Sequence, residues 1–124
     1  QLYSPFRDAL QSELKDGDKQ SYQMDISNRR EAIREVTLDL EEGADMVMVK
    51  PGTFYLDIIR EIRDRFDCPI AAYHVSGEYA MIKLAAQKGF LDDKAVLYEA
   101  LLGLKRAGAD VIISYGALEI ADLL

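Results

Sequence analysis

The stretch Asp45-Met46-Val47-Met48-Val49-Lys50-Pro51-Gly52 decides the fold class of this chain. Residues 46–49 form a continuous apolar run, which favours a strand buried on both faces over one that alternates between core and water. Pro51 and Gly52 end the run, because proline and glycine are the strongest breakers of regular structure. The stretch therefore predicts a short buried strand that is followed at once by a lysine.

Two further apolar runs, at residues 69–73 and 110–114, predict two more strands of this kind. Apolar residues at helical spacing predict helices around them. These helices are expected at residues 28–42, 54–66, 77–88, 93–107 and about 116–124. Ser27 or Asn28 is the expected N-cap of the first, and Gly43 and Gly108 are expected to stop the first and the fourth. Short apolar strands that alternate with helices imply parallel strands joined by right-handed crossovers. The predicted class is α/β, with roughly half of a TIM (β/α)8 barrel, since a whole one needs about 250 residues.

Residues 1–26 precede these α/β repeats and show no sustained period, which predicts a loop with at most one helical turn. Loops of this length in compact domains are usually functional or disordered. Residues 1–7 show neither an initiator methionine nor the pattern of a signal peptide. We therefore expect either a processed chain or a piece of a longer polypeptide.

Composition limits the classes of function. The 124 residues are 49% hydrophobic and 30% charged, as in ordinary globular proteins. The formal charge of −7 argues against a nucleic-acid partner, which needs a basic face, and no apolar window is long enough for a membrane span. Cys68 is the single cysteine and is expected to be structural, which favours a reduced, cytoplasmic setting.

The residues directly after the three strands are the first candidates for function, because parallel α/β folds bind ligands beyond the carboxyl ends of their strands. These residues are Lys50, the segment His74-Val75-Ser76 and the pair Ser114-Tyr115. A lysine that continues a buried strand lies near apolar walls, which favour its neutral, nucleophilic form. The alternative is that Lys50 extends its stem and solvates its head.

Hydroxyl groups accompany this lysine. Ser76 and Tyr115 can hydrogen-bond a carboxylate or a carbonyl, and ordinary helix capping is the alternative, above all for Ser76. His74 is the only histidine, which excludes a metal site built from several imidazoles and favours a core or rim position.

Charged residues outside the strand ends have two interpretations. Arg7 and Lys19, in the opening loop, are either solvated charges or an anion-binding pair. Glu31 and Glu35 lie one helical turn apart, so they either chelate a hard cation or face water.

Seven segments of the chain resemble motifs of the porphobilinogen synthase (delta-aminolevulinic acid dehydratase) family, in that family's order, and correspond to its C-terminal portion. Tyr3-Ser4-Pro5-Phe6-Arg7-Asp8-Ala9 is similar to the family's Y-G-P-F-R-D/E-A segment. The other segments are Tyr22-Gln23-Met24-Asp25, Asn28-Arg29-Arg30-Glu31-Ala32, Gly43-Ala44-Asp45-Met46-Val47-Met48-Val49-Lys50-Pro51-Gly52, Tyr55-Leu56-Asp57-Ile58, Val75-Ser76-Gly77-Glu78-Tyr79-Ala80-Met81 and Lys105-Arg106-Ala107-Gly108-Ala109-Asp110. The ordered set is highly specific, although each motif alone is weak.

The resemblance implies a single TIM-barrel domain, of which residues 1–124 are the C-terminal part, with residues 1–26 as an active-site loop region. It implies a lyase that condenses two 5-aminolevulinate molecules into porphobilinogen through two Schiff-base lysines, in tetrapyrrole and heme biosynthesis. Lys50 resembles the lysine that holds the substrate destined for the propionate side of the product. The other Schiff-base lysine of the family precedes the Y-G-P-F-R segment, so we expect the 124 residues alone to be inactive.

The resemblance also implies roles for the other candidates. Ser76 and Tyr115 resemble the residues that bind the carboxylate of the substrate on Lys50. Arg7, Lys19 and Gln23 resemble those around the second substrate. Glu35 resembles the ligand of an allosteric Mg²⁺, and Zn²⁺ is possible through residues upstream of this chain. A homo-oligomer, an octamer by resemblance, or a complementing N-terminal segment is the expected partner, and the expected location is cytoplasmic, or plastid in a plant or alga.

Two residues depart from the family pattern: Ser4 replaces a glycine, and Gly116 stands where an aromatic residue usually follows the tyrosine. Gly116 removes a large ring from the rim, which is expected to loosen the site. Two other functions remain open. One is a non-catalytic half barrel used for oligomerisation or metal-linked regulation through Glu35, and the other is a different lysine-using aldolase barrel.

Overall fold

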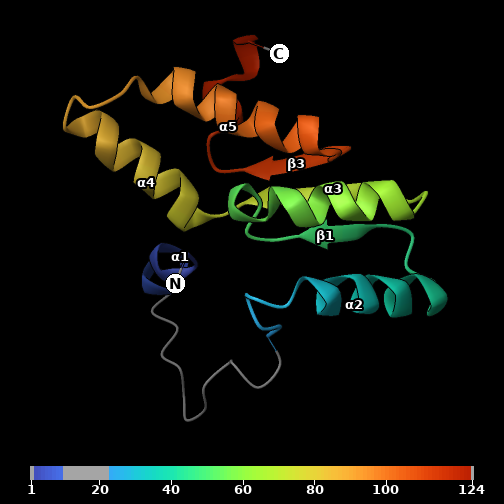
Figure 1. The fold of residues 1–124 in the computed structure, drawn as a ribbon. Helices are drawn as coiled ribbons and strands as arrows, with labels where there is room; N and C mark the ends of the chain where they lie inside the picture. Colours follow the sequence, from blue (N-terminus) through green and yellow to red (C-terminus); the bar gives the residue numbers. More distant parts are fainter. Residues whose placement is uncertain (1, 10–22, 124) are drawn as a thin grey trace.

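The computed structural model describes residues 2–9 and 23–123 (Figure 1). Its elements are α1 (Ser4–Ala9), α2 (Arg29–Glu41), β1 (Val47–Val49), α3 (Leu56–Arg65), β2 (Ile70–His74), α4 (Ser76–Gln87), α5 (Asp93–Ala107) and β3 (Val111–Ser114). Short 3-10 turns follow β1 at Thr53–Tyr55 (η2) and follow β3 at Ala117–Glu119 (η3) and Ala121–Leu123 (η4). Among the described residues, no helix combines the length and apolarity needed to cross a membrane.

The three strands form one parallel sheet in the order β1-β2-β3. Met48 is level with Ala71, and Ala71 is level with Val111, so these three side chains point to the same face of the sheet. The predicted parallel α/β architecture is confirmed, and each of the three predicted strands is present within one or two residues of its expected bounds.

Local signals in the sequence account for the ends of the helices. The Asn28 side chain accepts a hydrogen bond from the amide of Glu31 at 3.3 Å, which satisfies one free N–H of the first turn of α2. Gly43 follows α2 with φ +100°, and Gly108 follows α5 with φ +128°. Both are conformations that favour glycine, so the predicted stops at these two residues are confirmed.

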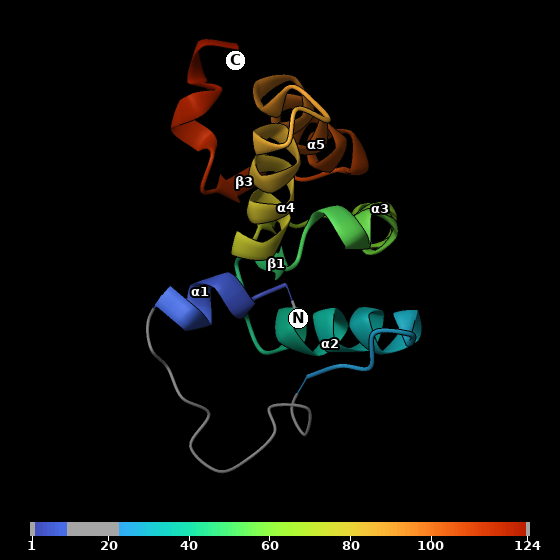
Figure 2. The same ribbon diagram turned by 90° about the vertical axis from the view of Figure 1, so that its left-hand side faces the viewer.

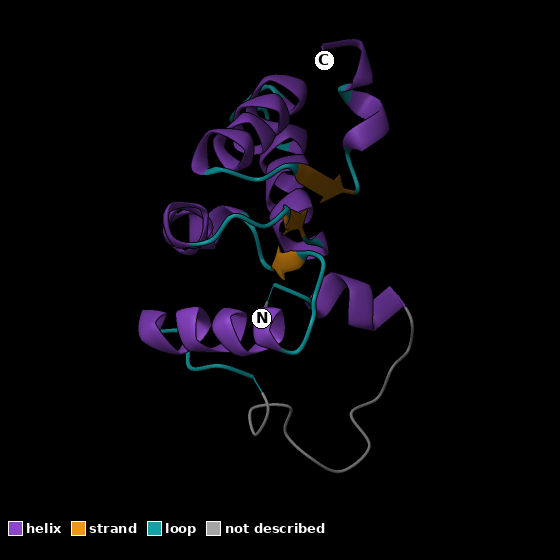
Figure 3. Cartoon of the chain, turned by 90° about the vertical axis from the view of Figure 1, so that its right-hand side faces the viewer, coloured by secondary structure: helices purple, strands orange, loops and turns teal. Residues whose placement is uncertain are grey.

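The core lies between the sheet and a layer of helices. Figures 2 and 3 show α2, α3 and α5 side by side on one face of the sheet, with α1 and the C-terminal turns towards the other side. Ile59 and Ile62 of α3 and Leu104 of α5 are almost fully buried against Ile70 and Ala72 of β2. Burial of these apolar side chains is the main stabilising contribution to this layer.

The expectation that all three strands are buried on both faces holds for β2 alone. Met48 of β1 is 47% exposed, and Val111 and Ile113 of β3 are 43% and 40% exposed. These residues lie on the sheet face opposite α2, α3 and α5, and the described part of the chain covers them only in part. The sheet therefore presents an apolar face, formed by Met48, Val111 and Ile113, which we call the open face.

The expected helix at about residues 116–124 is wrong, because two 3-10 turns, η3 and η4, stand in its place. Ile120, between the turns, is 1% exposed, whereas Leu118 is 91% exposed. With one anchored apolar residue, so short a segment lacks the packed face that stabilises most helices in water. At the other end of the chain, α1 is longer than the single turn expected there, and residues 10–22 of the opening loop lie outside the described residues.

Arg63 joins the elements at the N-terminal ends of the strands. Its guanidinium donates to the carbonyl of Gly108 at 2.9 and 3.1 Å and to that of Cys68 at 3.2 Å, and it pairs with Asp110. The Asp110 carboxylate also accepts from the amide of Ile70 at 2.8 Å. These contacts hold the N-terminal ends of the strands together, which leaves the opposite end of the sheet to carry functional groups.

Candidate functional site

The carboxyl ends of the three strands bring the predicted residues to one rim of the sheet. Lys50 directly follows β1 and continues its register one step beyond the pair Val49 and Ala72, which places it level with Tyr73. Ser76 begins α4 two residues after β2, and Tyr115 directly follows β3. The structure thus confirms that an amine and two hydroxyl groups come from neighbouring strand ends.

Lys50 is exposed at this rim, and its peptide bond to Pro51 is cis. The enclosed, apolar surroundings expected for its ammonium group are not formed by the described residues, because Lys50 remains exposed beside the open face of the sheet. Desolvation of the amine would therefore have to come from groups beyond residues 2–9 and 23–123.

The loop after Lys50 is held by a buried carboxylate that sequence reasoning left without a role. Glu78, in the first turn of α4, is 2% exposed. Its carboxylate accepts the amides of Thr53 at 2.6 Å, Val75 at 2.7 Å and Gly52 at 3.3 Å. The signal was available in the motif Val75-Ser76-Gly77-Glu78, since a glutamate at the third helical position often bonds back to the residue before the helix.

Ser76 does not cap α4, contrary to the expected alternative. Val75 holds the cap position, and the Ser76 hydroxyl accepts a hydrogen bond from the amide of Phe6 at 3.2 Å. The amide of Gly77 donates to the carbonyl of Leu2 at 2.8 Å. The start of α4 therefore anchors the N-terminal segment formed by residues 2–9, and α1 lies beside α4 (Figure 2).

Gly77 permits this close contact. A Cβ atom at Gly77 would lie 2.4 Å from the Leu2 carbonyl oxygen and 2.7 Å from the Leu2 Cα atom. Both atoms belong to the backbone, so a side chain at this position would have to displace the segment. Glycine is required here for close approach of two backbones, since its φ is not positive.

Three tyrosines gather at this rim: Tyr73 near the end of β2, Tyr79 on α4 and Tyr115 directly after β3. The Tyr73 hydroxyl donates to the Tyr115 hydroxyl at 3.4 Å, and the two rings stack with centroids 6.3 Å apart. That hydrogen bond, with some burial, raises the pKa of the Tyr73 phenol to about 12. The ring of Tyr79 lies 6.1 Å from that of Tyr115. Tyr115 itself is 46% exposed, so its hydroxyl remains accessible to a ligand.

Tyr79 is in turn fixed by ionic contacts. Its hydroxyl donates to the carboxylate of Glu119, which also pairs with Lys83 at 2.8 Å. Lys83 contacts Asp93 at 2.5 Å, and these two hydrogen bonds raise the pKa of its ammonium group. The cluster ties α4 to α5 and η3, and thereby supports the ring that packs against Tyr115.

His74 is a buried rim residue, as predicted. It is 1% exposed, and its Nδ1 atom lies 3.2 Å from the Ser114 hydroxyl. Burial lowers the pKa of the imidazole, although the nearby charge of Glu78 opposes that shift. A neutral histidine that holds the end of β3 fits this environment.

The residues predicted around a second substrate are only partly described. Arg7 lies on α1, half-buried, with its guanidinium 5.8 Å from the centre of the Tyr3 ring. Burial, together with the charge of Glu78, raises the pKa of the Tyr3 phenol. Gln23 is exposed ahead of α2, and Lys19 lies outside the described residues. Arg7 lies on α1, beside the start of α4.

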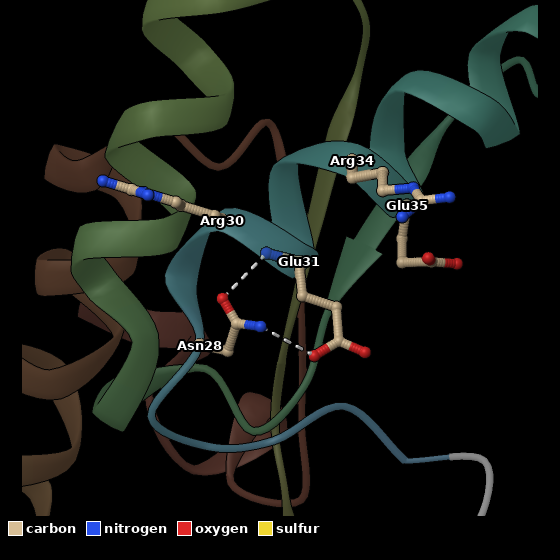
Figure 4. Close-up of a pocket in the computed structure, with 5 residues that line it drawn as sticks. All are labelled: Asn28, Arg30, Glu31, Arg34 and Glu35. Atoms are coloured by element: carbon tan, nitrogen blue, oxygen red, sulfur yellow. Dashed lines mark hydrogen bonds between the residues drawn. The ribbon is translucent and has the colours of Figure 1, made fainter.

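Glu35 lies apart from the rim, in a pocket on α2 (Figure 4). The pocket is lined by Asn28, Arg30, Glu31, Arg34 and Glu35. The side chain of Asn28 donates to that of Glu31 at 3.3 Å, so Glu31 is turned towards the start of the helix and away from Glu35. The described part of the chain holds no group of three or more His, Cys, Asp or Glu residues that could bind a metal ion. Glu35 therefore offers a single carboxylate.

Comparisons with known proteins agree with this arrangement. The model of the family "Delta-aminolevulinic acid dehydratase" matches residues 1–123. A curated delta-aminolevulinic acid dehydratase of Archaeoglobus fulgidus is 61% identical over 123 residues, which is 99% of this chain and 38% of the relative. Its counterpart in Escherichia coli K12 is 59% identical over 121 residues, or 98% of this chain and 37% of that relative. The chain thus spans less than two fifths of the length of these relatives.

A solved structure has the same fold. It is the crystal structure of delta-aminolevulinic acid dehydratase (porphobilinogen synthase) from Toxoplasma gondii ME49 in complex with the reaction product porphobilinogen. Its sequence is 52% identical to this chain, and the two structures align with a TM-score of 0.94. The alignment covers 99% of this chain and 35% of the other. The three parallel strands and their helices are therefore part of a TIM-barrel fold, as the sequence predicted.

Proposed function

This chain belongs to the delta-aminolevulinic acid dehydratase family, and on that premise we propose that its residues take part in condensing two 5-aminolevulinate molecules into porphobilinogen, a step of tetrapyrrole biosynthesis. The observation that carries the proposal is the position of Lys50 at the end of β1, on the same rim as Ser76 and Tyr115. An amine and two hydroxyl groups at neighbouring strand ends match a substrate that carries both a ketone and a carboxylate.

Lys50 is proposed as the nucleophile. In its neutral form, the Nζ atom attacks the ketone carbon of 5-aminolevulinate, and loss of one water molecule from the adduct leaves a C=N bond. The resulting Schiff base holds the substrate at the rim and, when protonated, withdraws electrons from the neighbouring carbon atoms. A lysine on a strand end places this nitrogen more reproducibly than one on a loop tip.

Ser76 and Tyr115 are proposed to bind the carboxylate of the substrate on Lys50. A hydroxyl has one proton to donate and two lone pairs to accept with. The Ser76 hydroxyl accepts from the amide of Phe6 at 3.2 Å and donates to the Leu2 carbonyl at 3.5 Å. The second bond is long, so a substrate carboxylate would take over this proton from the Leu2 carbonyl. Tyr115 contributes a second donor, held in place by its contacts with Tyr73 and Tyr79.

Arg7, Lys19 and Gln23 are proposed to contact the second substrate molecule. The support is the attachment of the segment that carries Arg7 to the start of α4, which brings a guanidinium to the side of the rim that holds Ser76. A guanidinium forms strong paired hydrogen bonds with a carboxylate.

A magnesium ion bound at Glu35 is a separate proposal. Mg²⁺ usually keeps several water ligands and binds through one or two carboxylates, so one exposed glutamate fits it as a partial ligand set. Bound there, the ion would act far from the rim, on the conformation or assembly of α2. Glu35 would hold it, and Asn28 and Glu31 would keep the first turn of α2 formed.

We also propose that this chain associates with an N-terminal segment or with other copies, and the open face supports this proposal. Met48, Val111 and Ile113 present apolar side chains on one side of a sheet whose two edge strands are also unpaired within the described residues. Such a surface favours strand pairing and burial by another segment. An N-terminal segment that completes the barrel would cover the open face and pair with the edge strands. A homo-oligomer would then be built from complete barrels.

Complementation tests the proposed activity. The chain is mixed with the part of the Escherichia coli relative that it does not match, and porphobilinogen formation from 5-aminolevulinate is measured. We expect turnover with the unaltered chain and with Lys105→Ala, a control at an exposed lysine of α5, and none with Lys50→Ala. Equal turnover by Lys50→Ala, or none by the unaltered chain in a complex verified by size exclusion, would contradict the proposal.

A further inference from the structure

Among the described residues, Glu78 is the most deeply buried carboxylate, and the proposed chemistry does not use it. It is 2% exposed, and no lysine or arginine in the described ranges forms an ion pair with it. A buried charge without a countercharge is costly unless hydrogen bonds compensate for lost water. Three backbone amides provide that compensation, at 2.6, 2.7 and 3.3 Å.

The three donors belong to two different strand-end loops. Gly52 and Thr53 lie two and three residues after Lys50, whereas Val75 lies directly before Ser76. The carboxylate oxygen Oε1 binds Thr53, and Oε2 is shared by Gly52 and Val75. One side chain therefore fastens the loop that follows the amine to the loop that carries the carboxylate-binding hydroxyl.

The loop after Lys50 is also held from its other side. A Cβ atom on Gly52 would lie 2.9 Å from the Leu104 Cδ2 atom and 3.2 Å from the Tyr73 carbonyl oxygen. Gly52 thus sits tightly against α5 and β2, and Glu78 closes the remaining side with hydrogen bonds. The backbone that leads back to Lys50 has little freedom between these contacts.

From this arrangement we propose that Glu78 is a positioning residue, which sets the distance between the Lys50 amine and the Ser76 hydroxyl by binding the amides of both strand-end loops. The proposal rests on the proposed role of Lys50 as a Schiff-base nucleophile. Glu78 touches no reacting atom. It acts by fixing the backbone that carries Lys50 and Ser76. Small misplacements of a catalytic side chain have large effects on the reaction rate.

Glu78→Gln is the test variant, because it keeps the size of the side chain but replaces one accepting oxygen with an amide NH2 group, which cannot accept from the backbone N–H that it faces. Asp110→Asn is the matched control. Its carboxylate also accepts a backbone amide, that of Ile70 at 2.8 Å, but at the N-terminal end of the same strands. Both variants alter a carboxylate that accepts hydrogen bonds from backbone amides. Only Glu78 lies beside the loop that follows Lys50.

Two readouts are taken on the 124-residue chain. Reductive trapping with 5-aminolevulinate and borohydride, followed by peptide mapping, gives the ratio of label on Lys50 to label on Lys105. Amide hydrogen exchange reports on Gly52 and Thr53 directly. For Glu78→Gln we expect the labelling ratio to fall at least about tenfold and both amides to exchange faster, while Asp110→Asn keeps the ratio within about twofold at the same folded fraction.

The outcomes separate this proposal from that for Lys50. An unchanged ratio in Glu78→Gln, or an equal fall in Asp110→Asn, overturns the positioning role. If the unaltered chain carries no label on Lys50, the proposed nucleophile has failed, and the positioning role stands only if exchange at Gly52 and Thr53 still responds to Glu78→Gln. If Glu78→Gln does not fold, the unaltered chain provides the test. The proposal is overturned if its Gly52 and Thr53 amides exchange as fast as amides in exposed loops.

Discussion

The amide of Phe6 donates a hydrogen bond to the hydroxyl of Ser76 at 3.2 Å, across 70 positions of sequence. This contact joins the segment that carries Arg7 to the rim that carries Lys50. It means that residues proposed for two different substrate molecules share one anchor, at the first residues of α4. Changes at this anchor are therefore expected to affect the binding of both substrate molecules.

Gly77→Ala should release the N-terminal segment. The added Cβ atom would lie 2.4 to 2.8 Å from three backbone atoms of Leu2, which cannot move without shifting residues 2–9. Amide hydrogen exchange over this segment should increase markedly. Gly103→Ala is the control, because its Cβ meets neighbours at 3.8 and 3.9 Å, and alanine in a helix is favoured by about 1 kcal/mol. Unaltered exchange in Gly77→Ala would contradict the anchoring role.

Tyr115→Phe should weaken binding of 5-aminolevulinate with little change in the structure. The variant removes one exposed hydroxyl that is proposed to donate to the substrate carboxylate, and a hydrogen bond to a charged group is worth about 1.5 to 3 kcal/mol. The concentration that half-saturates reductive labelling of Lys50 should rise by about tenfold or more. Tyr98→Phe, on α5, is the control. Equal half-saturation in Tyr115→Phe and the unaltered chain would exclude Tyr115 from the carboxylate site.

Folding stability should fall as the pH drops from about 6.5 towards 5. Burial lowers the pKa of His74 in the folded chain, so the unfolded chain binds more protons in this range and is favoured as the pH falls. His74 is the only histidine, and the carboxylates with lowered pKa values lose their contributions at lower pH. Denaturant unfolding at several pH values measures the slope, and His74→Gln should flatten it. A slope that persists in His74→Gln would assign the effect to another group.

Arg63→Ala should destabilise the chain by about 1 to 3 kcal/mol, because the carbonyls of Gly108 and Cys68 lose their partly buried donor. Arg60→Ala is the matched control. Arg60 pairs with Asp64 on the exposed surface of the same helix, where ion pairs contribute little. Thermal unfolding should show a clear loss for the first variant and almost none for the second. Equal losses would contradict a specific role for Arg63.

The open face should make the chain associate. Ile113→Lys places a charge on this face and should shift the chain towards the monomer in size-exclusion or sedimentation measurements. Phe90→Lys changes a residue that is 83% exposed in the loop after α4, and should leave the assembly as it was. A monomeric unaltered chain, or an assembly that ignores Ile113→Lys, would show that the open face does not mediate association.

The strands and most helix ends could be predicted because their signals are local. The apolar run at residues 46–49 and the breakers Pro51 and Gly52 define β1 without knowledge of its neighbours. Asn28 and Gly43 likewise mark the ends of α2 by their own chemistry. The three rim residues Lys50, Ser76 and Tyr115 followed from strand ends alone, since parallel strands end at the same edge.

The remaining features depend on contacts between distant segments. The role of Glu78 needs the amides of Gly52 and Thr53, which lie 26 and 25 positions away, and a glutamate in a first helical turn ordinarily indicates only a local cap. The contact between Ser76 and Phe6 spans the chain in the same way. The exposure of Lys50 depends on what covers the open face, which no periodicity within β1 reveals.

The most direct test of Lys50 as the nucleophile is a quantitative lysine map after trapping with 5-aminolevulinate and borohydride. The chain also carries exposed lysines on its helices, Lys94 and Lys105 among them, which serve as internal references. We predict that Lys50 carries most of the label, that labelling saturates with 5-aminolevulinate, and that Lys50→Ala removes it. Label spread evenly over the exposed lysines, or an unlabelled Lys50 in folded chain, would contradict the account.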